Sequence, residues 1–142
     1  VKIKLFKKSF YLIDESYNSN PLSLESALKK FDMIKISNSK KHLILGDMLE
    51  LGKYSKKLHM DIAKTINKTS LKNVNVIGED IKLTYKKINR SKKGIIIEDK
   101  SQIIDLIKNN LNINDYLMIK GSNSTGLNSL TNEIKMGKIN AL

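Results

Sequence analysis

The chain has no cysteine, no tryptophan and a single proline, Pro21. Without cysteine it can form no disulfide, no zinc–cysteine site and no thiol nucleophile. Two histidines, His42 and His59, are the only ones present, which leaves little for a histidine-based metal site. Apolar runs are only a few residues long, so the sequence encodes no membrane-spanning helix.

What the sequence does contain is enough apolar material for one folded domain. It has 142 residues, of which 40% are hydrophobic and 28% charged. This length and composition favour a single globular domain over residues 1–142 rather than a disordered tail. The first residue is Val1 rather than Met, so we expect a piece of a longer protein. The opening segment has no signal-peptide pattern, and the expected location is the cytoplasm.

The formal net charge is +12, which raises the possibility of a nucleic-acid partner. Of the 26 basic residues, however, only Arg90 is an arginine, and arginine is the residue favoured for bidentate recognition of phosphates and bases. We interpret the lysine excess, including the pairs 29–30, 40–41, 56–57, 86–87 and 92–93, as a solvated surface. We therefore expect no nucleic-acid partner and no membrane partner. A basic α/β nucleic-acid-binding module is the alternative reading.

Short apolar runs alternate with amphipathic segments along the whole chain. We expect strands at residues 10–13, 42–45, 74–77, 95–97 and 116–119, and helices at 22–31, 55–66, 81–88, 101–111 and 126–136. Residues 2–6 and 9–13 can pair as a hairpin that turns at Lys7-Lys8. Five strand–helix units in a row predict an α/β domain whose mostly parallel sheet is covered by helices on both faces.

Carboxylates gather where the predicted strands end. Ligands bind at this edge of an open α/β sheet. Eight of the 14 acidic residues lie there: Asp14, Glu15, Asp47, Glu50, Glu79, Asp80, Glu98 and Asp99. Such an asymmetry in a basic chain is the strongest pointer to a site. The alternative, which applies best to Asp80 and Asp99, is that these carboxylates only cap helix N-termini.

Three loops at this edge carry the polar groups of a candidate site. The loop DESYNSNP (14–21) can hydrogen-bond a ribose, an adenine edge or a cation, or else serve only to cap the next helix through Ser19 or Asn20. In GDMLELG (46–52), Gly46 permits close backbone approach and Asp47 would point into the cleft, unless this is a plain turn. In KGSNSTG (120–126), Lys120 and the following amides could cradle an anion, although Gly- and Ser-rich turns are common.

The histidines and the known nucleotide-binding motifs add little. His59 lies next to Leu58 at helical spacing, and we expect a structural role for it. His42 opens a predicted strand, and we expect it at the surface or at a sheet edge. The sequence contains neither GxGxxG nor GxxxxGK[ST], so it lacks a dinucleotide-binding fingerprint and a P-loop.

Three segments occur in an informative order: LIDESYNSNPLSLESAL, then LILGDMLELG followed by Leu58-His59, then LMIKGSNS. Together they resemble the C-terminal domain of the Mur ligases, from about Tyr11 to about Lys135. The resemblance implies a Rossmann-like three-layer domain with about six strands, which closes over a nucleotide held by a central domain. Within the family, the best match is the member that joins D-Ala-D-Ala to UDP-MurNAc-tripeptide in peptidoglycan precursor synthesis.

The resemblance also implies the reaction and the partners. Family members form an amide at the expense of ATP, through an acyl phosphate, with UDP-MurNAc-tripeptide and D-Ala-D-Ala as substrates. ATP and Mg²⁺ would be held mainly by the central domain, which carries the P-loop and the magnesium carboxylates. This chain would therefore have no catalytic residue and no metal ligand of its own, would be inactive in isolation, and is expected to be a monomer.

By the same resemblance, the nucleotide-binding residues are Asp14, Glu15, Asn18 and Asn20. Glu15 and Asn18 would be the main contacts with adenosine, and Asp14 competes with Glu15 for the acidic position. Asp47, Lys120 and Ser122 would border the substrate cleft. Asn123 stands where many relatives have arginine, so it lacks their charge.

A third reading is a stand-alone regulatory domain of the receiver type. It rests on Asp14-Glu15 after the first strand and Lys120 after the fifth. Receivers need an aspartate at the end of the middle strand, where this sequence has Ile77-Gly78.

Overall fold

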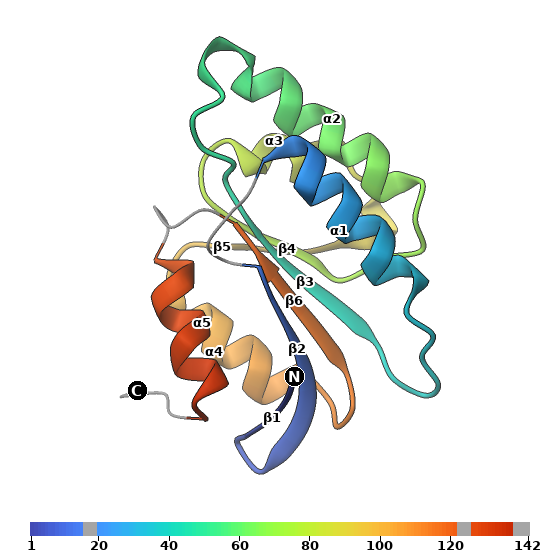
Figure 1. Ribbon diagram of the computed structural model, residues 1–142, viewed down its shortest axis with the longest axis vertical. Helices are drawn as coiled ribbons and strands as arrows, with labels where there is room; N and C mark the ends of the chain where they lie inside the picture. Colours follow the sequence, from blue (N-terminus) through green and yellow to red (C-terminus); the bar gives the residue numbers. More distant parts are fainter. Residues whose placement is uncertain (16–19, 122–125, 138–142) are drawn as a thin grey trace.

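The computed structural model describes residues 1–15, 20–121 and 126–137 and contains one six-stranded sheet with helices on both sides (Figure 1). The strands lie in the order β1-β2-β6-β3-β4-β5, and among these described strands only the β1–β2 pair is antiparallel. The strand bounds are β1 Lys2–Leu5, β2 Lys8–Glu15, β3 Lys41–Gly46, β4 Val74–Ile77, β5 Lys93–Ile97 and β6 Tyr116–Lys120. The expected α/β class and mostly parallel sheet are confirmed.

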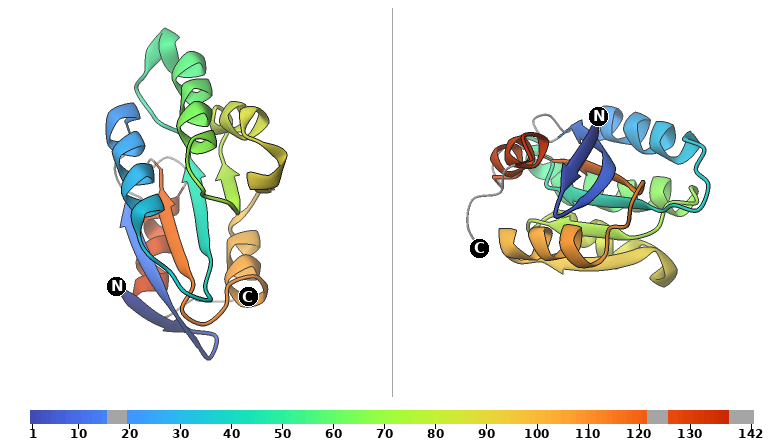
Figure 2. Two further views of the ribbon diagram at one scale, coloured as in Figure 1. Left: turned by 90° about the vertical axis from the view of Figure 1, so that its right-hand side faces the viewer. Right: turned by 90° about the horizontal axis from the view of Figure 1, so that it is seen from below.

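Within the described residues, five α-helices connect or follow these strands, each near its expected place. Their bounds are α1 Pro21–Met33, α2 Ser55–Asn67, α3 Ile81–Lys87, α4 Lys100–Asn109 and α5 Leu127–Lys135, and short 3₁₀ turns lie at Gly52–Tyr54 and Arg90–Lys92. Helices α1, α2 and α3 pack on one face of the sheet through Leu28, Phe31 and Ile66, among others. Helices α4 and α5 pack on the other face (Figure 2).

Local side-chain chemistry explains where two helices begin. Asn20 is the N-cap of α1, since its Oδ1 accepts from the backbone N of Ser23 at 2.9 Å, and Pro21 occupies the first turn as expected. Asp99 caps α4 in a reciprocal capping box with Gln102, so the capping interpretation of Asp99 is confirmed. Hydrogen bonding to Ser101 keeps the pKa of Asp99 below its usual value.

The predicted hairpin turn is wrong by one residue. Leu5 pairs with Lys8, so the turn residues are Phe6 and Lys7 rather than Lys7 and Lys8. Both have positive φ, 52° and 63°, as a two-residue turn between right-twisted antiparallel strands requires. Neither residue is of a type that favours this conformation, which is why the sequence indicated a hairpin but not its exact turn residues.

The surface or edge position expected for His42 is also wrong. Strand β3 lies inside the sheet between β6 and β4, and His42 is only 5% exposed. Its Nε2 lies 3.0 Å from Oδ2 of Asp115. The Asp115 carboxylate also accepts from the backbone N of Lys40 and of Asn112, both at 2.9 Å. A buried imidazole is tolerated here because this carboxylate satisfies it.

One of the supposedly solvated lysines is buried as well. Lys92 is 7% exposed, and its Nζ donates to the carbonyl oxygens of Thr69 and Leu71 at 2.6 and 3.0 Å. A lysine stem fills space between loops while its ammonium caps backbone carbonyls. A pair of adjacent lysines in a sequence cannot reveal which of the two is turned inward.

No helix in the described parts of the chain is long and apolar enough to cross a bilayer.

We predict that His42 makes the protein less stable in mild acid. Burial, the largest effect, lowers the pKa of His42 below its ordinary value of 6.5. As the pH falls below 6.5, the unfolded chain takes up this proton before the folded chain does, so the free energy of unfolding decreases. His42→Gln, which can still donate to Asp115, should flatten the pH dependence of the urea midpoint between about pH 7.5 and about pH 5. An unchanged slope in the variant would contradict this role.

Candidate functional site

The strand topology has a switch point at the carboxyl end of β6, and we call the region above it the crevice. The connections after β2 and β3, which flank β6, lead to helices α1 and α2 on one face. Helix α5, which follows β6, lies on the opposite face (Figure 1). Adjacent strands whose connections diverge in this way form the crevice where open α/β sheets bind ligands. Lys120, the last residue of β6, therefore stands at the centre of the expected edge.

Lys120 and Glu15 form a half-buried ion pair at this crevice. They are paired in register between β6 and β2, and Nζ of Lys120 lies 3.2 Å from Oε2 of Glu15. The Lys120 side chain is 5% exposed and that of Glu15 is 38% exposed. Oε2 is buried yet accepts no hydrogen bond, so the contact with Lys120 is electrostatic without hydrogen-bond geometry. The sequence predicted both residues at this edge but not their pairing.

Asp14 lies on the other face of the sheet from Glu15, as neighbouring residues of a strand must. Its Oδ2 accepts from Nζ of Lys135 on α5 at 2.9 Å. The two carboxylates that the sequence left as competing registers are thus directed to different faces. Glu15, with Lys120, is the one at the crevice, while Asn20 at the start of α1 is engaged in capping.

The backbones of β6 and β3 meet closely where the two strands end. A Cβ added to Gly121 would lie 2.9 Å from Cα of Gly46 and 2.9 Å from Cδ1 of Leu127. Only glycine fits there, because any side chain would push the strand ends apart or displace α5. The expected close approach at Gly46 is therefore confirmed, and Gly121 of the KGSNS segment is its partner.

Asp47 has a structural partner in the next loop. Its Oδ1 accepts from the backbone N of Ile81 at 2.8 Å and its Oδ2 from that of Glu79 at 3.1 Å. The carboxylate thus satisfies free amides before α3, in place of Asp80, whose side chain does not cap. A Cβ on Gly78 would lie 2.4 Å from Oδ1 of Asp47, so this arrangement also requires glycine at position 78. A substrate contact by Asp47 stays a prediction.

Ser55, His59 and Asp80 come together without forming a catalytic triad. His59 is fully buried, and its Nε2 accepts from the backbone N of Met48 at 3.0 Å, so that nitrogen carries no proton. Nδ1 lies 2.7 Å from the carbonyl oxygen of Ser55 and donates to it. The Ser55 hydroxyl donates instead to Oδ2 of Asp80 at 2.5 Å. The structural role expected for His59 is confirmed, since it ties the GDMLELG loop to α2.

This cluster was not predicted from the sequence. The four-residue spacing of Ser55 and His59 on a predicted helix places the two side chains on one face and could have indicated their contact. Two predicted site residues, Asn18 and Ser122, lie outside the described residues. Among the residues that the structure describes, no group of three or more His, Asp or Glu side chains is placed to hold a metal ion. A cavity of about 480 Å³ lies far from this edge, at the amino ends of β3 and β4.

Comparison with known proteins decides the family. The model of the "Mur ligase, glutamate ligase domain" family matches residues 4–123, which is most of the chain. The chain belongs to the Mur ligase family. The Mur ligase resemblance carried by the three loops is thereby confirmed, and the match includes the strands and loops that form the crevice.

The curated relatives agree with one another. UDP-N-acetylmuramoyl-tripeptide–D-alanyl-D-alanine ligase from Buchnera aphidicola is 30% identical over 125 residues, which is 87% of this Mur ligase chain and 26% of the relative. The enzyme of that name from Haemophilus influenzae is 30% identical over 120 residues, 82% of this chain and 25% of the relative. The chain thus spans about a quarter of the length of the curated relatives that it matches.

Solved structures show the same fold. The MurF ligase from Thermotoga maritima, in complex with ADP, aligns with a TM-score of 0.71 at 18% identity over 90% of this chain and 28% of the other. MurF from Acinetobacter baumannii aligns with a TM-score of 0.71 at 23% identity over 96% of this chain and 29% of the other. Both identities are low, so these alignments establish the Rossmann-like domain fold.

We predict that Asp47→Ala destabilises the domain by about 1–2 kcal/mol, because free amides at the start of α3 lose their acceptor. For a chain of this size the melting temperature should fall by about 3–8 °C in a thermal unfolding scan. Asp61→Ala is the matched control: Asp61 pairs only with Lys57 and Lys64 on the surface of α2, and its loss should shift the melting temperature by less than about 2 °C. Equal shifts in the two variants would contradict the capping role.

Proposed function

We propose that this chain is the nucleotide-closing C-terminal domain of an ATP-dependent ligase that joins D-Ala-D-Ala to UDP-MurNAc-tripeptide. The observation that carries the proposal is the agreement of the family match with two relatives of that name at 30% identity. The crevice above β6 supports it, because its polar groups lie at one sheet edge and become useful when another domain arrives. The proposed setting is peptidoglycan precursor synthesis in the cytoplasm.

The described residues fit a nucleotide or an anionic substrate group at this edge. Lys120 is a nearly buried cation at the crevice, which suits a carboxylate or phosphate oxygen. The Glu15 side chain is 38% exposed, so it is accessible to a ligand although its Oε2 is buried against Lys120. A ribose hydroxyl or an adenine amino group is a donor that such a carboxylate can accept from. We propose Glu15 and Asn18 as the adenosine contacts, with Asn20 holding the loop through its cap.

The chemistry would be completed outside this chain. ATP would supply the phosphoryl group that activates the tripeptide carboxylate, and Mg²⁺ would neutralise its phosphates. The role of this domain is to bring Lys120 and Glu15 against the bound nucleotide and to exclude water from the reactive intermediate. The sequence carries no P-loop, which supports a division of the reaction between this domain and another that holds the nucleotide phosphates.

We predict that the isolated chain releases no ADP from ATP in the presence of UDP-MurNAc-tripeptide and D-Ala-D-Ala. The full-length gene product should release one ADP per amide formed, measured by coupled ADP detection and mass spectrometry of the product. ADP release by the isolated chain would overturn the proposed division of the site between domains. If the full-length product is inactive with D-Ala-D-Ala but active with a single amino acid, the chain belongs to an enzyme from another branch of the family.

In the full-length enzyme, Glu15→Ala and Asn18→Ala should each raise the KM for ATP by about tenfold, the loss expected for one hydrogen bond at a binding site. The KM for D-Ala-D-Ala should stay within about twofold. Asp61→Ala, which removes an exposed carboxylate on α2, is the control with the same charge change as Glu15→Ala. If both variants keep the ATP kinetics of the parent enzyme, the residue assignment is wrong.

A further inference from the structure

The amino ends of the parallel strands, opposite the crevice, carry exposed basic residues and no exposed carboxylate in the same segments. Five segments lie there: the turn at 6–7 and the loops at 34–40, 68–73, 88–92 and 110–115. Their only carboxylate is Asp115, which is 1% exposed and paired with His42. Their exposed basic residues are Lys7, Lys35, Lys40, Lys68, Lys72 and Arg90, which we call the basic rim.

The opposite edge carries charges of both signs, since Lys82, Lys100 and Lys120 lie there beside the carboxylates. Asp47, Glu79 and Glu98 follow β3, β4 and β5, and Glu15 ends β2. In the five segments at the amino edge, by contrast, no exposed carboxylate accompanies the six exposed basic residues. The positive potential at that edge is therefore not compensated locally.

Large apolar side chains are exposed within the same rim. Ile113 is 63% exposed, Met33 at the end of α1 is 78% exposed, and Ile36 is 38% exposed. Figure 2 (left) shows the loops that carry Ile36 and Ile113 beside the β1–β2 turn at the lower end of the molecule. Exposed aliphatic side chains surrounded by lysine are typical of surfaces that enter the boundary between lipid headgroups and acyl chains.

Hydrogen bonds hold these two loops together. The backbone N of Lys40 donates to Oδ1 of Asp115 at 2.9 Å, and the N of Tyr116 donates to the carbonyl oxygen of Lys40 at 2.9 Å. The Asp115 carboxylate also accepts from the N of Asn112, next to Ile113. These hydrogen bonds fix the backbone of the two loops. Little conformational entropy is therefore lost when their apolar side chains insert into a lipid headgroup region.

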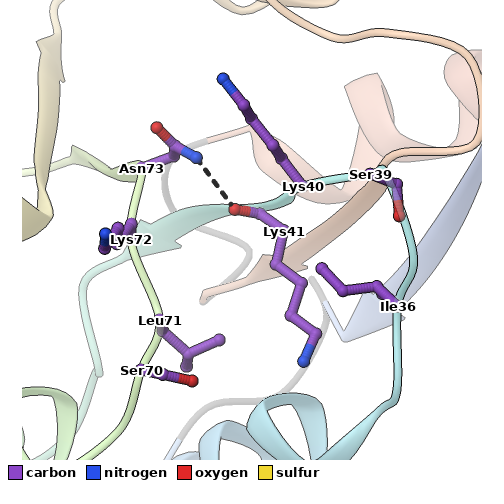
Figure 3. A pocket seen from close by; sticks show the side chains of 8 residues that line it. All are labelled: Ile36, Ser39, Lys40, Lys41, Ser70, Leu71, Lys72 and Asn73. Atoms are coloured by element: carbon purple, nitrogen blue, oxygen red, sulfur yellow. Dashed lines mark hydrogen bonds between the residues drawn. The ribbon is translucent and has the colours of Figure 1, made fainter.

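A hollow of about 480 Å³ lies in the rim between loops 34–40 and 68–73 (Figure 3). Its lining includes the hydroxyls of Ser39 and Ser70 and the side chains of Lys40 and Lys72. Figure 3 shows the side chains of Lys40 and Lys41 extending in opposite directions. Nζ of Lys41 donates to the carbonyl oxygen of Asp32, whereas Lys40 and Lys72 are exposed. The Ser70 hydroxyl donates to Oδ1 of Asp32 at 2.6 Å, so the Ser39 hydroxyl and the ammonium groups of Lys40 and Lys72 are the groups that suit a phosphodiester headgroup.

We propose that the basic rim binds an anionic phospholipid surface, with a headgroup phosphate in this hollow and Ile113, Ile36 and Met33 in the headgroup–acyl boundary. Nucleic acid fits less well, because the rim has one arginine and the aromatic ring in its segments, Phe6, is packed against the core and covered by Lys108. This proposal departs from the sequence-based expectation of no membrane partner. The sequence does not show which lysines share one edge of the sheet, whereas the fold does. The crevice then faces away from the membrane and stays open to a second domain.

Vesicle co-sedimentation with the full-length gene product tests this proposal. We expect binding to vesicles of equal parts phosphatidylglycerol and phosphatidylcholine, none to phosphatidylcholine alone, and weakening with added salt. Lys40→Gln/Lys72→Gln should lower the partition coefficient about thirtyfold, since each lysine near an anionic surface contributes about 1 kcal/mol. The control Lys53→Gln/Lys56→Gln, with the same charge change beside the crevice, should lower it less than about threefold.

Further measurements identify the source of any binding. Ile113→Ser should lower binding to anionic vesicles severalfold at unchanged charge, and circular dichroism melts should show that all variants remain folded. Equal losses in the two lysine pairs would overturn the proposal, because they would reflect net charge alone. So would equal binding to neutral vesicles, or a fluorescent single-stranded RNA that binds more tightly than the vesicles do.

Discussion

The position of β6 between β2 and β3 is the constraint on which the rest of the structure depends. The last strand of the chain fills the centre of the sheet, so the sheet is incomplete until almost the whole domain has been made. Its start is held by the Asp115 carboxylate, which accepts from two loop amides and pairs with His42. Its end is held by the close contact of Gly121 with Gly46. Packing at both ends leaves β6 little freedom of register.

This one insertion also creates the crevice. Because β6 leads to α5 on one face while its two neighbours lead to α1 and α2 on the other, the loops diverge above Lys120. The buried ammonium of Lys120 would be costly without a counter-charge, and Glu15 on the adjacent strand supplies it. The same pair supplies groups of both signs for a ligand that arrives with another domain. The proposed ligase function and the stability of the strand ends thus rest on the same residues.

The polar side chains at the two ends of the sheet have different roles. At the carboxyl edge, carboxylates cap helices or face the crevice, as Asp99, Asp47 and Glu15 do. At the amino edge, buried polar groups such as Asp115 and Lys92 tie loops together while the remaining basic side chains point to solvent. A surface that recruits the domain can therefore lie at one edge without obstructing a site at the other, which is the arrangement that our two proposals require.

The element order and the edge where the polar groups collect could be predicted from local sequence patterns. Apolar periodicity is a local property, and it placed β4 at its observed bounds and every helix within two residues at each end. The three loop motifs around Glu15, Asp47 and Lys120, taken together, indicated the Mur ligase family. Strand order, the burial of His42 and Lys92, the opposite directions of Asp14 and Glu15, and the Ser55–His59–Asp80 cluster were decided only by the tertiary structure. Each of these depends on which segments meet in space, and a polar residue is buried only where a distant partner satisfies it.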